Sequence, residues 1–128
     1  MHRILPYGLA VIFLLSGGAK LAGLDFEVRA FERWGYPPAF MYLTGALEVA
    51  GAIGLLIPPL SALAGACLAL LMIGAVGTHI AFAEWPMMFV AGAILLAAAA
   101  RAWAGRREIK ALPGRLRRHA DRGGSTNA

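Results

Sequence analysis

Four long apolar runs alternate with short polar segments along the chain, at about residues 4–23, 38–57, 60–82 and 87–104. Each run has about 20 residues, and an α-helix of that length extends about 30 Å, enough to cross the apolar layer of a bilayer. The pattern therefore predicts an all-α protein in which residues 1–104 form four transmembrane helices.

The short segments between the runs predict how the helices are connected. Pro58-Pro59 separates the second run from the third, and Glu84-Trp85-Pro86 separates the third from the fourth. Proline interrupts a helix, and connections of a few residues force neighbouring helices to run antiparallel. The expected architecture is an antiparallel four-helix bundle. Small residues four positions apart also favour close helix packing in lipid, at Gly18/Ala22, Ala46/Ala50/Gly54, Ala62/Ala66 and Gly74/Thr78.

The longest connection, residues 24–36, allows two interpretations. One is a short amphipathic helix in the headgroup region, capped by Asp25. Its apolar side would carry Phe26, Ala30, Phe31 and Trp34, with Glu27, Arg29 and Arg33 largely elsewhere. The other is an irregular loop whose aromatic residues anchor at the membrane interface. The sequence does not separate the two.

Composition supports a membrane domain, because 59% of the residues are hydrophobic and only 15% are charged. An ordinary soluble domain has about a quarter of its residues charged. The first run resembles a signal peptide with Arg3 as its charged region, but it continues into Lys20 and further runs follow. We therefore expect it to be a membrane span.

The basic residues gather at one end of the chain. Eight of the twelve Lys and Arg residues fall between Arg101 and Arg122. In membrane proteins the segments that flank the spans on the cytoplasmic side carry the excess of Lys and Arg. Arg3 precedes the first span and the eight basic residues follow or end the fourth, so both termini are expected in the cytoplasm. Residues 105–128 are predicted to form a basic cytoplasmic tail, partly disordered, with its helix broken at Pro113-Gly114. The charge suits anionic lipid headgroups. Nucleic-acid binding is not expected, because no nucleic-acid motif accompanies the charge.

Three ionisable residues fall inside the apolar runs: Lys20, Glu48 and His79. At 1.5 Å per residue, Lys20 and His79 would lie about 5 Å inside the outer end, with Glu48 about 10 Å deeper. Ser16 and Thr44, each one helical turn from Lys20 or Glu48, would bridge the gap. Small residues share the side of Glu48, so another helix can approach it. The hypothesis is one polar cavity, open to the outer face, that holds a polar head group, a quinone ring or a proton path.

Each of these residues also has a purely structural interpretation. Lys20 would extend to the headgroups, and His79 would bond to a backbone carbonyl. Glu48 would hydrogen-bond across helices as a neutral carboxyl. Glu84 is expected in solvent at the membrane boundary. Cys67, the single cysteine, is expected in the core and excludes an intrachain disulfide.

No catalytic or cofactor motif stands out in the sequence. His79 and Glu84 are five positions apart, which does not align two metal ligands on a helix, so no metal site is expected. No Ser-His-Asp set, P-loop or dinucleotide fingerprint is found, and haem would need a second buried ligand. A self-contained enzyme is therefore not expected. The one cofactor that the predicted cavity suggests is a quinone.

Four segments resemble the DoxX-like membrane proteins: SGGAKLAG at 16–23, FERWGYP at 31–37, GALEVAGAIGLLIP at 45–58 and GAVGTH at 74–79. The resemblance covers about residues 4–104 and includes the Lys, Glu and His positions. It implies a four-helix protein of the bacterial inner membrane. The family takes its name from a small subunit associated with quinol oxidase and thiosulfate:quinone oxidoreductase. Other relatives look like partners in redox-stress complexes or assembly factors for membrane receptors.

Three functions follow as expectations. The first is an accessory subunit of a membrane redox system that binds a lipid-like or quinone-like molecule at Lys20, Glu48 and His79. The second is a small proton-coupled transporter with Glu48 as its switch, and the third is a membrane-protein assembly factor. Membrane lipids and a redox protein are the expected partners, and the small-residue faces would also allow a homodimer.

Overall fold

A computed structural model of the protein describes residues 4–125, which form helices and no β-strand. The elements are α1 (Ile4–Leu21), α2 (Asp25–Trp34), α3 (Pro38–Leu56), the 3-10 turn η1 (Pro58–Leu60), α4 (Ser61–Ala81), α5 (Trp85–Ala104) and α6 (Arg106–Ser125). Within this range α1, α3, α4 with η1, and α5 are long and apolar enough to cross a membrane. The predicted all-α fold with four transmembrane helices is confirmed.

Prolines mark the starts of the helices. Pro38 begins α3, Pro58 begins η1, and Pro86 is the second residue of α5. The first turn of a helix has no intrahelical partner for its N–H groups, so proline is tolerated there. For this reason α5 begins at Trp85, inside the segment that we predicted to be a turn.

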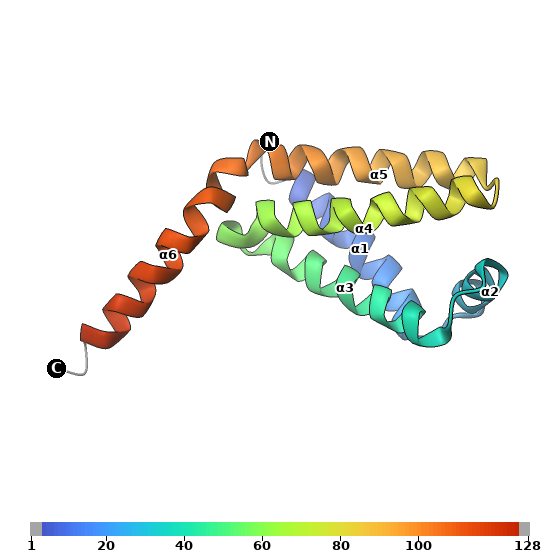
Figure 1. Cartoon of the computed structure of the whole chain (residues 1–128), viewed down its shortest axis with the longest axis horizontal. Coiled ribbons are helices and arrows are strands. Elements are labelled where there is room, and N and C mark those ends of the chain that lie inside the picture. Colours follow the sequence, from blue (N-terminus) through green and yellow to red (C-terminus); the bar gives the residue numbers. More distant parts are fainter. Residues whose placement is uncertain (1–3, 126–128) are drawn as a thin grey trace.

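The four spans form two close pairs, α1 with α3 and α4 with α5. α3 joins the pairs by packing on α4, while α1 and α5 have fewer contacts. Figure 1 shows the pairs close together near α6 and diverging toward α2. The apolar core includes Leu9, Phe13, Ala52, Leu55, Leu68 and Ala98. The bundle is therefore closed at the α6 end and splayed at the α2 end.

Glycines set the closest approaches between helices. A Cβ added at Gly17 would lie 2.7 Å from the carbonyl oxygen of Gly45, and one added at Gly54 would lie 2.9 Å from the Cβ of Ala64. The side of α3 that carries Glu48 is thus approached closely, as the sequence predicts. The predicted contacts at Gly18 and Gly74 are wrong, because no described atom lies within 4 Å of an added Cβ at either position.

The amphipathic interpretation of the connection between the first two spans is confirmed by α2. Asp25, however, makes no cap, because it is the first helical residue and Leu24 occupies the N-cap position without a side-chain bond. The aromatic side is also divided: Phe31 is 5% exposed, whereas Phe26 is 64% exposed. Phe31 therefore packs inward, while Phe26 in the first turn faces outward.

The predicted helix break at Pro113-Gly114 is wrong, because α6 continues through both residues to Ser125. An interior proline costs a helix about 3 kcal/mol. Favourable helix formers precede it, and Leu112 is buried against the bundle, which supports the helix at this point. Residues 126–128 of the predicted disordered end, and Arg3, lie outside the described residues.

The prediction that Cys67 is a core residue is also wrong, because its side chain is exposed on α4. The residues of α4 are largely apolar on every side of the helix, so its sequence has no polar face that would indicate which side is exposed.

Candidate functional site

A cavity of about 400 Å³ lies where the two helix pairs diverge, and all of α1 to α5 contribute to its wall. This volume falls in the range of roughly 300–1,000 Å³ that small-molecule pockets occupy. Most of the wall is apolar, and it includes Phe13, Met72 and Ile94. All five residues predicted to form a polar cavity line it: Ser16, Lys20, Thr44, Glu48 and His79.

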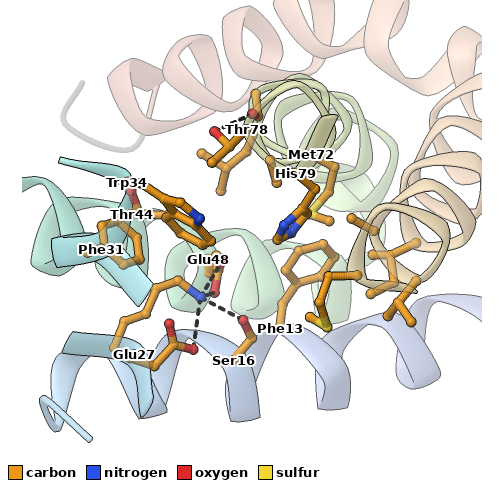
Figure 2. Close-up of a pocket in the computed structure, with 18 of the residues that line it drawn as sticks. Phe13, Ser16, Glu27, Phe31, Trp34, Thr44, Glu48, Met72, Thr78 and His79 are labelled. Atoms are coloured by element: carbon orange, nitrogen blue, oxygen red, sulfur yellow. Dashed lines mark hydrogen bonds and ion pairs between the residues drawn. The ribbon is translucent and has the colours of Figure 1, made fainter. Parts of the chain in front are cut away.

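Lys20 is the centre of the polar part of this wall. Its Nζ lies 3.3 Å from Oε1 of Glu48 and 3.4 Å from Oε1 of Glu27, and it donates to Ser16 Oγ at 2.9 Å. Figure 2 shows these contacts converging on the ammonium group. The side chains of Lys20 and Glu48 are 11% and 7% exposed. The interpretation in which Lys20 extends to the headgroups is therefore wrong. Glu48 does bond across helices, as its structural interpretation predicts, and its partner there is the ammonium of Lys20.

The crossing of α1 and α3 explains why Lys20 and Glu48 meet directly. A Cβ added at Gly45 would lie 2.8 Å from the Cβ of Lys20. Lys20 therefore lies against Gly45, less than one helical turn from Glu48. The predicted depth difference of about 10 Å is wrong, because that estimate assumed level span ends, and the end of α1 lies beside the middle of α3 rather than beside its start.

Glu27 is the cavity residue that the sequence interpretation placed elsewhere. It lies in the first turn of α2, seven positions after Lys20, and lines the cavity. The helix folds back over the end of α1, which brings the two side chains together. Its signal in the sequence is an acidic residue in the first turn of a helix that directly follows a buried lysine.

His79 belongs to a second cluster at the cavity, centred on Glu84. Nδ1 of His79 lies 3.0 Å from Oε1 of Glu84, and Trp34 Nε1 donates to the same oxygen at 2.9 Å. Arg33 pairs with the other carboxylate oxygen. Two predictions are therefore wrong: Glu84 is not freely solvated, with 18% of its side chain exposed, and the partner of His79 is a carboxylate rather than a backbone carbonyl.

This cluster ties α2 to the α4–α5 connection. Glu84 lies outside the spans, between Ala81 and Trp85. Partial burial raises the pKa of Glu84, but the hydrogen bonds with His79, Trp34 and Arg33 lower this pKa by a larger amount. The pKa of this carboxyl therefore lies below its usual range. The carboxylate form is thus the one that holds the cluster together.

Thr44 lines the cavity but does not bridge Lys20 and Glu48. Its hydroxyl donates to the carbonyl of Phe40 at 2.8 Å, within its own helix. Ser16 accepts a hydrogen bond from Lys20, but Lys20 and Glu48 meet directly, so neither Ser16 nor Thr44 has a gap to bridge. A threonine in a helix readily bonds to the carbonyl one turn earlier.

Aromatic rings form one wall of the cavity. Phe31, Trp34, Tyr36 and Phe40 all line it and contact one another, with ring centroids 5.2 to 6.2 Å apart. The Tyr36 hydroxyl is 2.9 Å from Thr78 Oγ1, which joins this wall to α4. Figure 2 shows Phe31 and Trp34 on one side of Glu48, and Phe13 and His79 on the other.

Among the described residues, no group of three or more His, Cys, Asp or Glu side chains is placed to hold a metal ion. The arrangement instead offers one ammonium, several carboxylates and an imidazole on a largely apolar surface. It can orient a polar group by hydrogen bonds and surround an attached apolar body.

Comparison with known proteins identifies the family of the chain. The sequence profile of the DoxX-like family matches residues 4–101, a range that contains every residue of the cavity wall. The chain is 35% identical over 52 residues to YdgD of Bacillus subtilis (strain 168), which is described as an uncharacterized protein. That match covers 41% of this chain and 46% of YdgD, so the chain matches about half the length of this relative. No solved structure matches the chain.

Proposed function

The chain belongs to the DoxX-like family, and from this premise we propose that it binds a lipid-like or quinone-like molecule in its cavity as an accessory subunit of a membrane redox system. The observation that carries the proposal is the buried Lys20–Glu48 pair on the wall of a mostly apolar cavity.

A structural role alone is a weak explanation for this pair. A charge inside a membrane span costs at least a few kcal/mol, and replacing a buried ion pair with apolar residues is often neutral or stabilising. A pair of this kind is better explained if it orients the polar head of a bound molecule. The apolar and aromatic walls would then hold the rest of that molecule.

The edge of the cavity supports entry from the membrane. Ile12 of α1 and Val90 of α5 line the cavity and are 42% and 52% exposed. These helices belong to the two diverging pairs, and the exposed surface of a membrane span faces lipid. A hydrophobic molecule would therefore reach the polar group without crossing water.

We place the protein in the bacterial inner membrane with both termini in the cytoplasm. α6 and the start of α1 lie at the same end of the bundle, and α2 lies at the other (Figure 1). The excess of Lys and Arg in and before α6 supports a cytoplasmic position for that end.

The test is mass spectrometry of the small molecules and proteins retained after gentle detergent extraction. The wild-type protein should retain one class of lipid or quinone above its level in the membrane extract. The Lys20→Met/Glu48→Gln double variant should lose it. Glu32→Gln, a carboxylate change on the exposed side of α2, is the matched control and should retain it. An identical composition in all three proteins would contradict the proposal.

A second candidate function is proton-coupled transport, favoured by the line of charges from Glu48 through Lys20 to Glu27. Substrate-driven proton flux in vesicles, lost in Glu48→Gln, would support it. A stoichiometric protein partner retained without any small ligand would instead favour an assembly factor.

A further inference from the structure

The charges on the cavity wall do not balance. Lys20, Glu27 and Glu48 all line the cavity, so one ammonium faces two carboxylates. His79 and Tyr36 line the same wall. The third carboxylate of the region, Glu84, pairs with Arg33 and bonds to Trp34 and His79. Between the ammonium of Lys20 and the carboxylates of Glu27 and Glu48, the wall carries one formal negative charge in excess.

The geometry at Lys20 agrees with this imbalance. Its Nζ is 3.3 Å from Glu48 and 3.4 Å from Glu27, while its shortest contact, at 2.9 Å, is to the neutral hydroxyl of Ser16. Charge-assisted bonds between an ammonium and a carboxylate are normally about 2.7–2.9 Å long. The single ammonium is therefore shared between two carboxylates at long range, and a second positive group would complete the site.

The aromatic wall adds a second, independent feature. Phe31, Trp34, Tyr36 and Phe40 contact one another with interplanar angles between 51° and 62°. No pair among these is stacked in parallel, and the guanidinium carbon of Arg33 lies 5.9 Å from the centroid of the Trp34 ring, so one of these rings already has a cation beside it. An organic cation is attracted to the face of an aromatic ring, and groups of such rings recognise quaternary ammonium ligands.

We propose that the cavity selects an amphiphile with a cationic amine or quaternary ammonium head and an apolar body. The head lies between Glu27, Glu48 and the aromatic wall, and the body lies against Phe13, Met72 and Ile94. A cationic head brings the formal charge of the site to zero, a neutral head leaves it at minus one, and an anionic head raises it to minus two. The inference rests on the proposed function, since it names the class of molecule that the same cavity binds.

The test compares three amphiphiles with one chain length: decyltrimethylammonium, decanol and decyl phosphate. The protein is held in nanodiscs of a neutral glycolipid, which has no amine or ammonium head, with empty nanodiscs as the blank for partitioning. The chain has three tryptophans. Trp85 and Trp103 are 51% and 70% exposed, so Trp85→Phe/Trp103→Phe leaves Trp34 as the reporter on the cavity wall. Binding is followed by the change in its fluorescence.

The ammonium compound should saturate the Trp34 signal at about one tenth of the concentration that decyl phosphate requires, with decanol between them; tenfold corresponds to about 1.4 kcal/mol. Glu27→Gln and Glu48→Gln should each abolish most of this preference, and Lys20→Met should enlarge it. Glu32→Gln, on the same helix as Glu27 but outside the cavity wall, should leave it unchanged.

The outcomes separate this inference from the function on which it rests. Equal binding of all three compounds would overturn the cationic class and leave a cavity that binds amphiphiles. Binding of none of them would overturn the proposed function as well. A preference that persists in Glu27→Gln also overturns the inference, and this variant at the cavity mouth gives a result even if Glu48→Gln does not fold.

Discussion

Two cations with little exposed side-chain surface, Lys20 and Arg101, lie at opposite ends of the bundle and have similar partners. Nε of Arg101 donates to Ser61 Oγ at 2.9 Å, and its Nη2 lies 3.4 Å from Glu108. Lys20 likewise bonds to a serine and pairs with carboxylates. The side chains of the two cations are 11% and 16% exposed. The same chemistry therefore occurs twice, once in the cavity and once away from it.

The packing around the two cations differs, and the residues next to each of them in the sequence do not predict this difference. At Arg101, a Cβ added at Gly65 would lie 3.1 Å from the carbonyl oxygen of Ala98, and the carboxylate partner Glu108 is 41% exposed. At Lys20, Glu48 is buried, Glu27 is half-buried, and the helix pairs have separated around a cavity. The comparison teaches that helix separation, rather than residue type, decides whether an enclosed cation packs between helices or faces a cavity.

The largest expected effect comes from removing each cation in turn. Lys20→Met leaves the carboxylate of Glu48 buried without its partner, which should lower the free energy of unfolding by about 3 kcal/mol. Arg101→Met should cost only about 1 kcal/mol, because water can solvate Glu108. Equilibrium unfolding in mixed micelles measures both. Lys20→Met/Glu48→Gln should recover most of the loss, and equal losses at the two ends would break the comparison.

The next effect concerns the helix crossing beneath Lys20. Gly17→Ala places a methyl group against the backbone of Gly45 and should lower the free energy of unfolding by about 1–3 kcal/mol through overpacking. Gly18→Ala is the matched control on the same helix. No described atom lies within 4 Å of its added Cβ, so it should stabilise the helix by up to about 1 kcal/mol. The same unfolding measurement separates them, and a harmless Gly17→Ala would contradict the close crossing.

The smallest effect is the pH dependence of the Glu84 cluster. The folded-state pKa of Glu84 lies below its usual range. Between this lowered pKa and the pKa of the unfolded chain, the folded protein therefore binds fewer protons than the unfolded chain. The stabilisation is present above about pH 4.3, the ordinary pKa of a glutamate, and is lost as the pH falls through the lower folded-state value. Because the side chain of Arg33 is 57% exposed, this pH-dependent stabilisation should be less than about 1 kcal/mol.

Thermal unfolding between pH 3 and pH 6 measures the effect. The wild-type protein should be more stable than Glu84→Gln at pH 6, and the difference should shrink on acidification. A difference that stays constant over this range would exclude a role for the Glu84 carboxylate.

Much of the fold was predictable from the sequence, because apolar runs and prolines are local signals. The four spans and Pro58-Pro59 illustrate this. The tail was not predictable in the same way, since Pro113 lies in a helix whose burial of Leu112 depends on tertiary contacts. The exposure of Cys67 was hidden for a related reason, because α4 has no polar face.

The sequence identified most of the residues of the candidate site, but it did not show which of these side chains contact one another. Lys20 and Glu48 stood out because charged residues are rare in apolar runs. Glu27 and Glu84 lie in polar connections, where a carboxylate is ordinary. Their inward positions follow from how α2 folds back over α1 and contacts the α4–α5 connection. Such contacts between distant segments leave no periodic signal in the sequence.

Thiol labelling at the two serines tests most directly whether one cation faces a cavity and the other does not. In a Cys67→Ser background, which removes the native exposed thiol, Ser16→Cys and Ser61→Cys each place one thiol beside Lys20 or Arg101. Ser16 lines the cavity, and Ser61 is 2% exposed and does not. A small methanethiosulfonate reagent should label the Ser16→Cys protein, decyltrimethylammonium should protect it, and the Ser61→Cys protein should react far more slowly. Equal labelling of the two proteins, or labelling of the Ser16→Cys protein that no amphiphile prevents, would contradict the account.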